Sequence, residues 1–147
     1  QPYGTEASCG KPKAATPFPR ADTNRHECYP KLVGSRRKQR LLLEVASSDR
    51  TFERKQLDGE QVLEGKCIHC QRKLALRSDG APINGATLEH IVPKNHGGTD
   101  ELENLAIACA RCNSEKGLRH DHKRADDPKL REIIARLQER RQKQFRK

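Results

Sequence analysis

The stretch LEHIVPKNHGG, residues 88–98, places two titratable side chains next to each other. Glu89 and His90 lie in a short β-like run, which Pro93 and two glycines then interrupt. Histidine is the side chain whose charge changes nearest to neutral pH, so it is suited to moving protons. A carboxylate can hold a hard cation or form an ion pair. This pair is the first candidate for chemistry in the chain.

Four cysteines form two pairs with the spacing C-x2-C. Cys67 and Cys70 make the first pair, and Cys109 and Cys112 make the second. Each pair can place two thiolates on one metal, and four soft ligands in a tetrahedron suit Zn²⁺. The alternative is two disulfides or four free thiols, but a C-x2-C disulfide is a strained redox device and its usual βαβ surroundings are missing. The spacing therefore predicts one structural zinc.

Three other side chains leave alternatives open. His69, inside the first pair, is expected to be an exposed spacer or else a substitute zinc ligand. Cys9 and Cys28 have no close partner in the sequence, so they are free thiols or, in an exported protein, one disulfide.

The composition indicates one small domain that needs help to fold. Among 147 residues, 33% are hydrophobic and 34% are charged, with three Phe, two Tyr and no Trp. This leaves little material for a large core. Zinc binding contributes about 10 kcal/mol or more of folding free energy in small metal domains. Chelation is therefore expected to unfold the core.

The net charge of +10 and the pI near 9.6 favour a polyanionic partner, with nucleic acid as the leading class and a merely soluble basic surface as the alternative. No apolar run approaches the roughly 18 residues that a membrane helix needs, so no membrane association is expected. The chain contains no Met, which indicates a sequence that is trimmed, processed or a fragment. A cytoplasmic location is expected, with export after processing as the alternative.

The chain divides into four segments. Residues 1–34 hold five of the eight prolines and predict an extended arm, and residues 35–64 predict two short basic helices interrupted at Gly59. Residues 65–122 carry the cysteine pairs, short β-like runs and turns, and form the chemical core. Residues 123–147 predict an amphipathic helix with a basic tail. Its apolar stripe, expected to pack on the core, is Leu130, Ile133, Ile134 and Leu137.

Within the core the pattern predicts a strand, a loop, a strand and a helix. The run ATLEHIV leads through the Pro/Gly loop to ENLAIACA, and the second cysteine pair opens the polar stretch RCNSEKGLRH. The pieces CIHC, EHIVP, HGG, ENL and CARCNSEKG, in this order, resemble the zinc-containing HNH endonuclease family over about residues 65–118. The resemblance implies an α+β fold: a small ββα-metal core with a four-cysteine structural zinc, flanked by basic helices and the Pro-rich arm.

The resemblance also implies roles for single residues. His90 would be the general base, Asn104 would belong to the catalytic set by holding the loop, and Glu89 and Asn113 would hold a catalytic Mg²⁺ or Mn²⁺ ion. The family often has Asp and His where this chain has Glu89 and Asn113. Proton abstraction and charge neutralisation by a hard cation suit phosphodiester hydrolysis. The alternatives are a structural His90, a salt-bridged Glu89 and a helix-capping Asn113.

Geometry raises one difficulty for this assignment. Adjacent residues of a regular strand point to opposite faces, so Glu89 and His90 can share a cleft only if Pro93 and the glycines bend the strand. Four cations are candidate phosphate contacts around the cleft: Lys94, Arg111, Lys116 and Arg119. The basic residues 36–40 and the tail 140–147 are expected to add nonspecific phosphate contacts.

The leading expectation is a metal-dependent endonuclease that hydrolyses DNA, with RNA left open as a substrate and the oligomeric state unassigned. A noncatalytic zinc module that binds nucleic acid is the first alternative. The second is a zinc-stapled interaction domain that docks a partner through the C-terminal helix.

Overall fold

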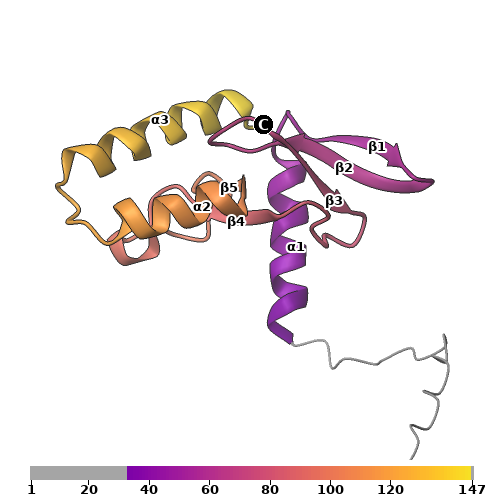
Figure 1. The fold of residues 1–147 in the computed structure, drawn as a ribbon, viewed down its shortest axis with the longest axis horizontal. Coiled ribbons are helices and arrows are strands. Elements are labelled where there is room, and N and C mark those ends of the chain that lie inside the picture. Colours follow the sequence, from indigo (N-terminus) through magenta and orange to yellow (C-terminus); the bar gives the residue numbers. More distant parts are fainter. Residues whose placement is uncertain (1–32, 147) are drawn as a thin grey trace, which may run out of the picture. The chain divides into compact units, whose positions relative to one another are not determined.

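The computed structural model describes residues 33–146. Nearly all of the predicted arm, with Cys9 and Cys28, lies outside them. The first part of the fold comprises α1 (Val33–Ser47), β1 (Glu53–Leu57), β2 (Glu60–Lys66) and β3 (Lys73–Arg77). The second comprises β4 (Ala86–His90), η1 (Lys94–His96), β5 (Leu105–Cys109), α2 (Ala110–Lys116), η2 (Gly117–Asp121) and α3 (Pro128–Gln144) (Figure 1).

The strands form two small antiparallel sheets, one of β1, β2 and β3 and one of β4 and β5. The prediction of a second basic helix before residue 65 was wrong, because β1 and β2 form a hairpin there. Asp58 and Gly59 both adopt positive φ, 51° and 83°. That is the conformation of a two-residue hairpin turn, for which Asp-Gly is a strong signal. This turn outweighs the helix propensity of the flanking Glu, Lys and Gln residues.

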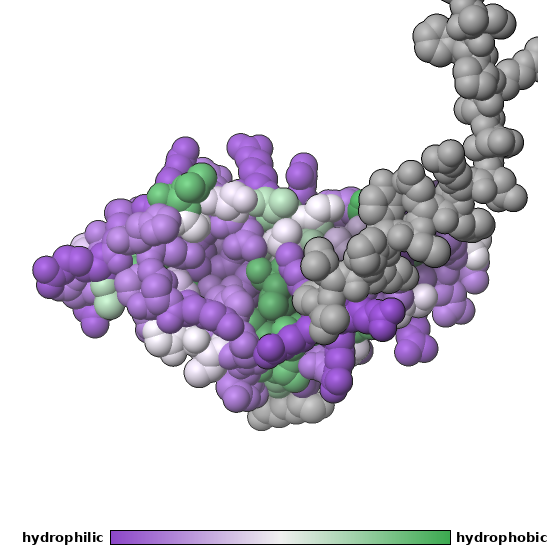
Figure 2. All heavy atoms as spheres, turned by 90° about the horizontal axis from the view of Figure 1, so that it is seen from below, coloured by the Kyte–Doolittle hydropathy of each residue, from purple (hydrophilic) through white to green (hydrophobic). Residues whose placement is uncertain are grey.

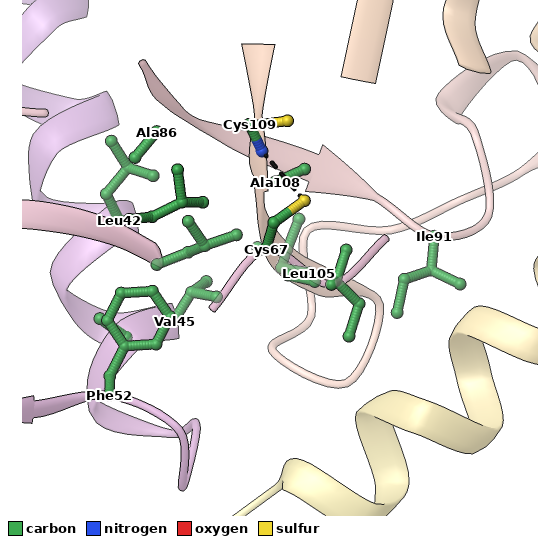
Figure 3. Close-up of a cluster of buried hydrophobic side chains, with 14 of the residues drawn as sticks. Leu42, Val45, Phe52, Cys67, Ala86, Ile91, Leu105, Ala108 and Cys109 are labelled. Carbon is green, nitrogen blue, oxygen red and sulfur yellow. Dashed lines mark hydrogen bonds between the residues drawn. The ribbon is translucent and has the colours of Figure 1, made fainter. Parts of the chain in front are cut away.

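The core lies where α1 meets β4 and β5. Leu42 and Val45 of α1 pack in one cluster with Phe52 and with the wholly buried strand β5 (Figure 3). The strand β5 is followed at once by α2, so β4, the loop, β5 and α2 occur in the order that the sequence predicts. The α+β class with a small cysteine-bearing core is confirmed.

The C-terminal helix α3 begins as its sequence predicts. Asp127 is the N-cap and accepts hydrogen bonds of 3.0 Å from the backbone N–H groups of Lys129 and Leu130. In the expected stripe, Leu130, Ile133 and Leu137 are buried and Ile134 is half-buried. Burial of this stripe attaches α3 to the rest of the domain.

Two basic residues of α3 point inward, contrary to the prediction that the whole tail contacts phosphate. Arg140 donates hydrogen bonds of 2.6 and 2.8 Å to the carbonyls of Ile68 and His69 in the first cysteine pair. Arg141 is buried and donates to the carbonyl of Leu102, in the loop between β4 and β5, at 2.9 Å. These guanidinium groups donate hydrogen bonds to partly buried backbone carbonyls and so have structural roles.

The surface is strongly polar. Figure 2 shows a face made mostly of hydrophilic residues, with only a narrow apolar strip near its middle. Among the helices of the described residues, none has the length and apolar character to cross a membrane.

Candidate active site

The four cysteines of the two pairs meet at one point. Cys67 and Cys70 follow β2, while Cys109 ends β5 and Cys112 lies in α2. Their four Sγ atoms all lie within 4.8 Å of one another. The Cys109 N–H donates to Cys67 Sγ at 3.3 Å, which fastens the first pair to the end of β5 (Figure 3). Four clustered sulfurs fit a tetrahedral zinc ion, and no other trio of His, Cys, Asp or Glu in residues 33–146 is close enough to hold a metal.

The thiols differ in how readily they ionise. The backbone N–H of Arg72 stabilises the Cys70 thiolate and lowers the pKa of Cys70 to about 7. Burial raises the pKa of Cys67, and burial with neighbouring thiols raises that of Cys112. Crowding of several thiols around one point disfavours their ionisation without a cation, and a bound metal ion reverses this.

The imidazole of His90 is held by a carboxylate of the following loop. His90 Nε2 lies 2.8 Å from Asp100 Oδ1, and Lys94 Nζ lies 2.9 Å from the same carboxylate. The hydrogen bonds from His90, and then from Lys94, lower the pKa of Asp100 to about 2, so this carboxylate is ionised at neutral pH. An ionised carboxylate accepts a proton donor, so Nε2 carries the hydrogen and the lone pair of neutral His90 is on Nδ1. The His90 side chain is 23% exposed.

Asn104 closes the loop between β4 and β5 from inside. Its Oδ1 accepts from the Val92 N–H at 2.8 Å, and its Nδ2 donates to the carbonyls of Val92 and Thr99 at 3.1 and 2.9 Å. This is the backbone bonding that the sequence predicts for it. The loop needs glycine at two positions for different reasons. Gly97 has a φ of 82°, which favours glycine, and a side chain on Gly98 would collide with the Val92 carbonyl.

Glu89 lies in a buried charged cluster. Its side chain is 1% exposed, and its oxygens lie 2.8 Å from Lys116 Nζ and 3.3 Å from His69 Nε2. Neither oxygen accepts a directed hydrogen bond from the described residues. Lys116 Nζ also lies 3.0 Å from Asp121 Oδ1 and donates to the His90 carbonyl. A buried lysine thus compensates two carboxylates.

Asn113 and Lys116 are one helical turn apart on α2, and both side chains reach β4. Asn113 Nδ2 donates to Thr87 Oγ1 at 3.0 Å and to the Leu88 carbonyl at 2.9 Å. Asn113 lies inside the helix, and the N-cap is Cys109, so the capping alternative is excluded. The amide oxygen of Asn113 makes no hydrogen bond with a described residue and can serve as a ligand.

The structure does not place Glu89 and His90 on one face. The strand β4 pairs regularly with β5 up to His90↔Leu105, so the proposed bend is not within the strand. Leu88 and His90 share the face that meets the Pro/Gly loop and α1. Thr87 and Glu89 share the opposite face, which meets α2. The two titratable neighbours therefore have separate surroundings.

The four candidate phosphate contacts differ in exposure. Lys94 and Arg111 are exposed, and so is Arg119, which pairs with Glu115. Lys116 was expected beside them, but its side chain is only 3% exposed within the Glu89 cluster. The sequence contains a signal for the inward position of Lys116. Lys116 lies three residues after Asn113, and residues at this spacing share a helix face.

Sequence reasoning missed three residues of the site. Asp100 and Asp121 come from polar turns, and nothing in the sequence marks them as partners of His90 and Lys116. His69 has neither expected role, since it is only 12% exposed and faces Glu89. Its place within the first cysteine pair was the only signal, because the cluster of the four cysteines brings this turn close to α2.

Comparison with known proteins identifies the segment that carries this arrangement. The HNH endonuclease family model matches residues 67–119, less than half of the chain. Searches of curated proteins and of solved structures found no match. The matched segment begins at Cys67 and contains the four clustered cysteines, Glu89, His90, Asn104 and Asn113. Residues 67–119 therefore match the HNH endonuclease family, and the four cysteines that could hold a zinc ion lie within this match.

Proposed function

We propose that the protein is a metal-dependent endonuclease that hydrolyses phosphodiester bonds of DNA. The observation that carries this proposal is the imidazole of His90, which is partly exposed and oriented by the ionised Asp100 within the family-matched segment. A base of this kind must have a free lone pair and a defined direction. Both follow from the 2.8 Å contact between Nε2 and Asp100.

His90 acts on water in this proposal. Its Nδ1 takes a proton from a water molecule as that water attacks phosphorus, while Nε2–H remains bonded to Asp100. The imidazolium that forms is stabilised by the adjacent carboxylate. Asn104 contributes by holding Val92 and Thr99, which lie on either side of Lys94 in the same loop. It is thus a positioning residue.

Glu89 and Asn113 are the proposed ligands of the catalytic cation. The two buried Glu89 oxygens accept no directed hydrogen bond, and the Asn113 amide oxygen is unused, so hard oxygen ligands are available beside β4. A bound Mg²⁺ or Mn²⁺ ion would neutralise negative charge on the phosphate and the leaving oxygen. Because Glu89 faces α2 while His90 faces the loop and α1, this requires a phosphate at the end of β4 that meets both faces of the strand. Glu89 must exchange its contact with Lys116 for the ion, so Lys116 is expected to weaken ion binding.

DNA is the proposed substrate because the family is nuclease-like and the chain carries a net charge of +10. The test is cleavage of supercoiled plasmid by the zinc-loaded chain with Mg²⁺, with EDTA, and with the His90→Ala variant. His122→Ala, which removes an exposed histidine outside the matched segment, is the control. Nicking should require Mg²⁺ and be lost only in His90→Ala. Salt-sensitive binding without cleavage in any divalent metal would instead establish a noncatalytic zinc module.

A further inference from the structure

We propose that α1 supplies a phosphate-binding wall to the His90 cleft, with Arg37 and Lys38 holding a backbone phosphate of the strand to be cut. This inference rests on the proposed function, because it assigns the substrate contacts of the same site. The helix precedes the segment that the family model matches, so these contacts belong to this chain and not to the shared domain.

A cavity of about 340 Å³ joins α1 to the candidate base. It is bordered by α1 and, much later in the sequence, by β4 and the loop that follows it. Figure 1 shows α1 beside β4, and α1 packs against both β4 and β5. The cavity is lined by Arg37, Lys38, Leu41, Leu88, His90, Lys94 and Asp100.

The helical period explains why two of the α1 cations reach this cavity. Arg37 and Lys38 are four and three residues before Leu41, which also lines it, so the three side chains share a face. Arg36 and Arg40 are four residues apart on a different stripe, and Arg40 pairs with Glu44 at 2.9 Å. Leu42 and Val45 bury the same helix in the core, so the cationic face has a rigid support.

The charged side chains that line the cavity favour the binding of an anion. Arg37, Lys38 and Lys94 bring three positive charges, against the single carboxylate of Asp100. That carboxylate is already shared by Lys94 and His90. Arg37 and Lys38 are exposed and form no ion pair with any residue in the described part of the chain. A phosphodiester offers oxygens to both, and arginine can bind such a group through two parallel hydrogen bonds.

The cavity also relates these contacts to the reaction. A phosphate held by Arg37 and Lys38 lies in the same cavity as the His90 ring, so the strand is fixed where the base can act on a bond close by. Such contacts position the backbone and carry no base preference. They should therefore strengthen binding to all sequences alike, in a salt-dependent way.

The test compares two double variants of equal charge on one helix, Arg37→Gln/Lys38→Gln and Arg36→Gln/Arg40→Gln. Binding of a short fluorescein-labelled DNA duplex is measured by anisotropy over a series of salt concentrations in EDTA, which does not depend on cleavage. The first variant should bind about tenfold more weakly and with a salt slope lower by about one to two, while the second should change affinity by less than about twofold. Thermal unfolding verifies that both variants fold.

Two results would overturn the proposal. If both variants weaken DNA binding equally, the effect is due to overall charge, and if neither weakens it, Arg37 and Lys38 do not contact the phosphate. A selective loss of binding in the first variant supports the phosphate wall even if the protein cleaves no DNA, so failure of the proposed function is seen separately in the plasmid assay. If the protein does cleave, the first variant should raise KM while the second leaves KM near that of the unmodified chain.

Discussion

Substitution of Asp100 tests which ring nitrogen of His90, the proposed base, carries the hydrogen. Its ionised carboxylate fixes the hydrogen of His90 on Nε2. The Asp100→Asn amide can donate to Nε2 and so favour the opposite tautomer, which removes the lone pair from Nδ1. We predict that Asp100→Asn lowers kcat on the order of 100-fold.

The Asp100→Asn variant should also change the ¹⁵N shifts of the His90 ring, which report the tautomer directly. Asp126→Asn, at an exposed position that pairs with Arg124 alone among the described residues, is the control and should leave both readings unchanged. An unchanged ring spectrum in Asp100→Asn would show that the 2.8 Å contact does not determine the tautomer.

Lys116 gives a prediction about stability. Its ammonium is buried between Glu89 and Asp121, and removing one partner of a buried ion pair leaves uncompensated charge. Lys116→Met should lower the free energy of unfolding by about 3 kcal/mol, measured by urea denaturation. Mg²⁺ should restore part of this loss by binding Glu89. Lys129→Met, at an exposed ion pair, should cost less than about 1 kcal/mol. If Lys116→Met lowers the free energy of unfolding by as little as Lys129→Met does, Lys116 does not compensate buried charge.

At the scale of elements, the loop between β4 and β5 depends on Asn104. This side chain makes three hydrogen bonds to the loop backbone. Asn104→Ala should speed hydrogen exchange of the Val92 amide and lower cleavage, because His90 then loses the ordered Asp100 beside it. Asn95→Ala removes an exposed side chain that bonds outside the loop, to the Asp121 carbonyl, and is the matched control. Equal exchange rates in both variants would refute the role of Asn104.

The sequence predicts the elements well where local chemistry is decisive. The cap at Asp127 and the stripe from Leu130 to Leu137 are confirmed because capping and helical periodicity are local. The hairpin of β1 and β2 was misread as a helix. There the Asp58-Gly59 turn and pairing with β3, a long-range contact, outweigh residue propensity.

At the scale of the whole molecule, the cysteine cluster joins parts of the fold that lie far apart in sequence. It connects the turn after β2 with the end of β5 and with α2. Removing zinc with a strong chelator should therefore abolish cooperative thermal unfolding, since about 10 kcal/mol of binding free energy is lost. Metal analysis should find one zinc per chain. Retention of the full melting temperature without zinc would contradict a structural metal.

The same scale explains which parts of the site the sequence reveals. Motif spacing makes part of the site recognisable from the sequence alone, namely the four clustered cysteines, Glu89, His90, Asn104 and Asn113. Nothing in the sequence marks Asp100. His69 and the α1 cations are noticed in the sequence, but only the fold shows that they lie beside β4. Opposite faces for Glu89 and His90 follow from strand alternation, but whether the strand bends cannot be read from the sequence.

Rescue of a His90→Ala variant by imidazole is the most direct measurement of the central claim. Single-turnover cleavage of a DNA duplex would be followed in Mg²⁺ for the unmodified chain and for His90→Ala, each with and without added imidazole. We predict that His90→Ala loses at least about 100-fold in rate and that imidazole restores part of it, while the unmodified chain is unaffected. Cleavage by His90→Ala at the unmodified rate would contradict the assignment of His90 as the base.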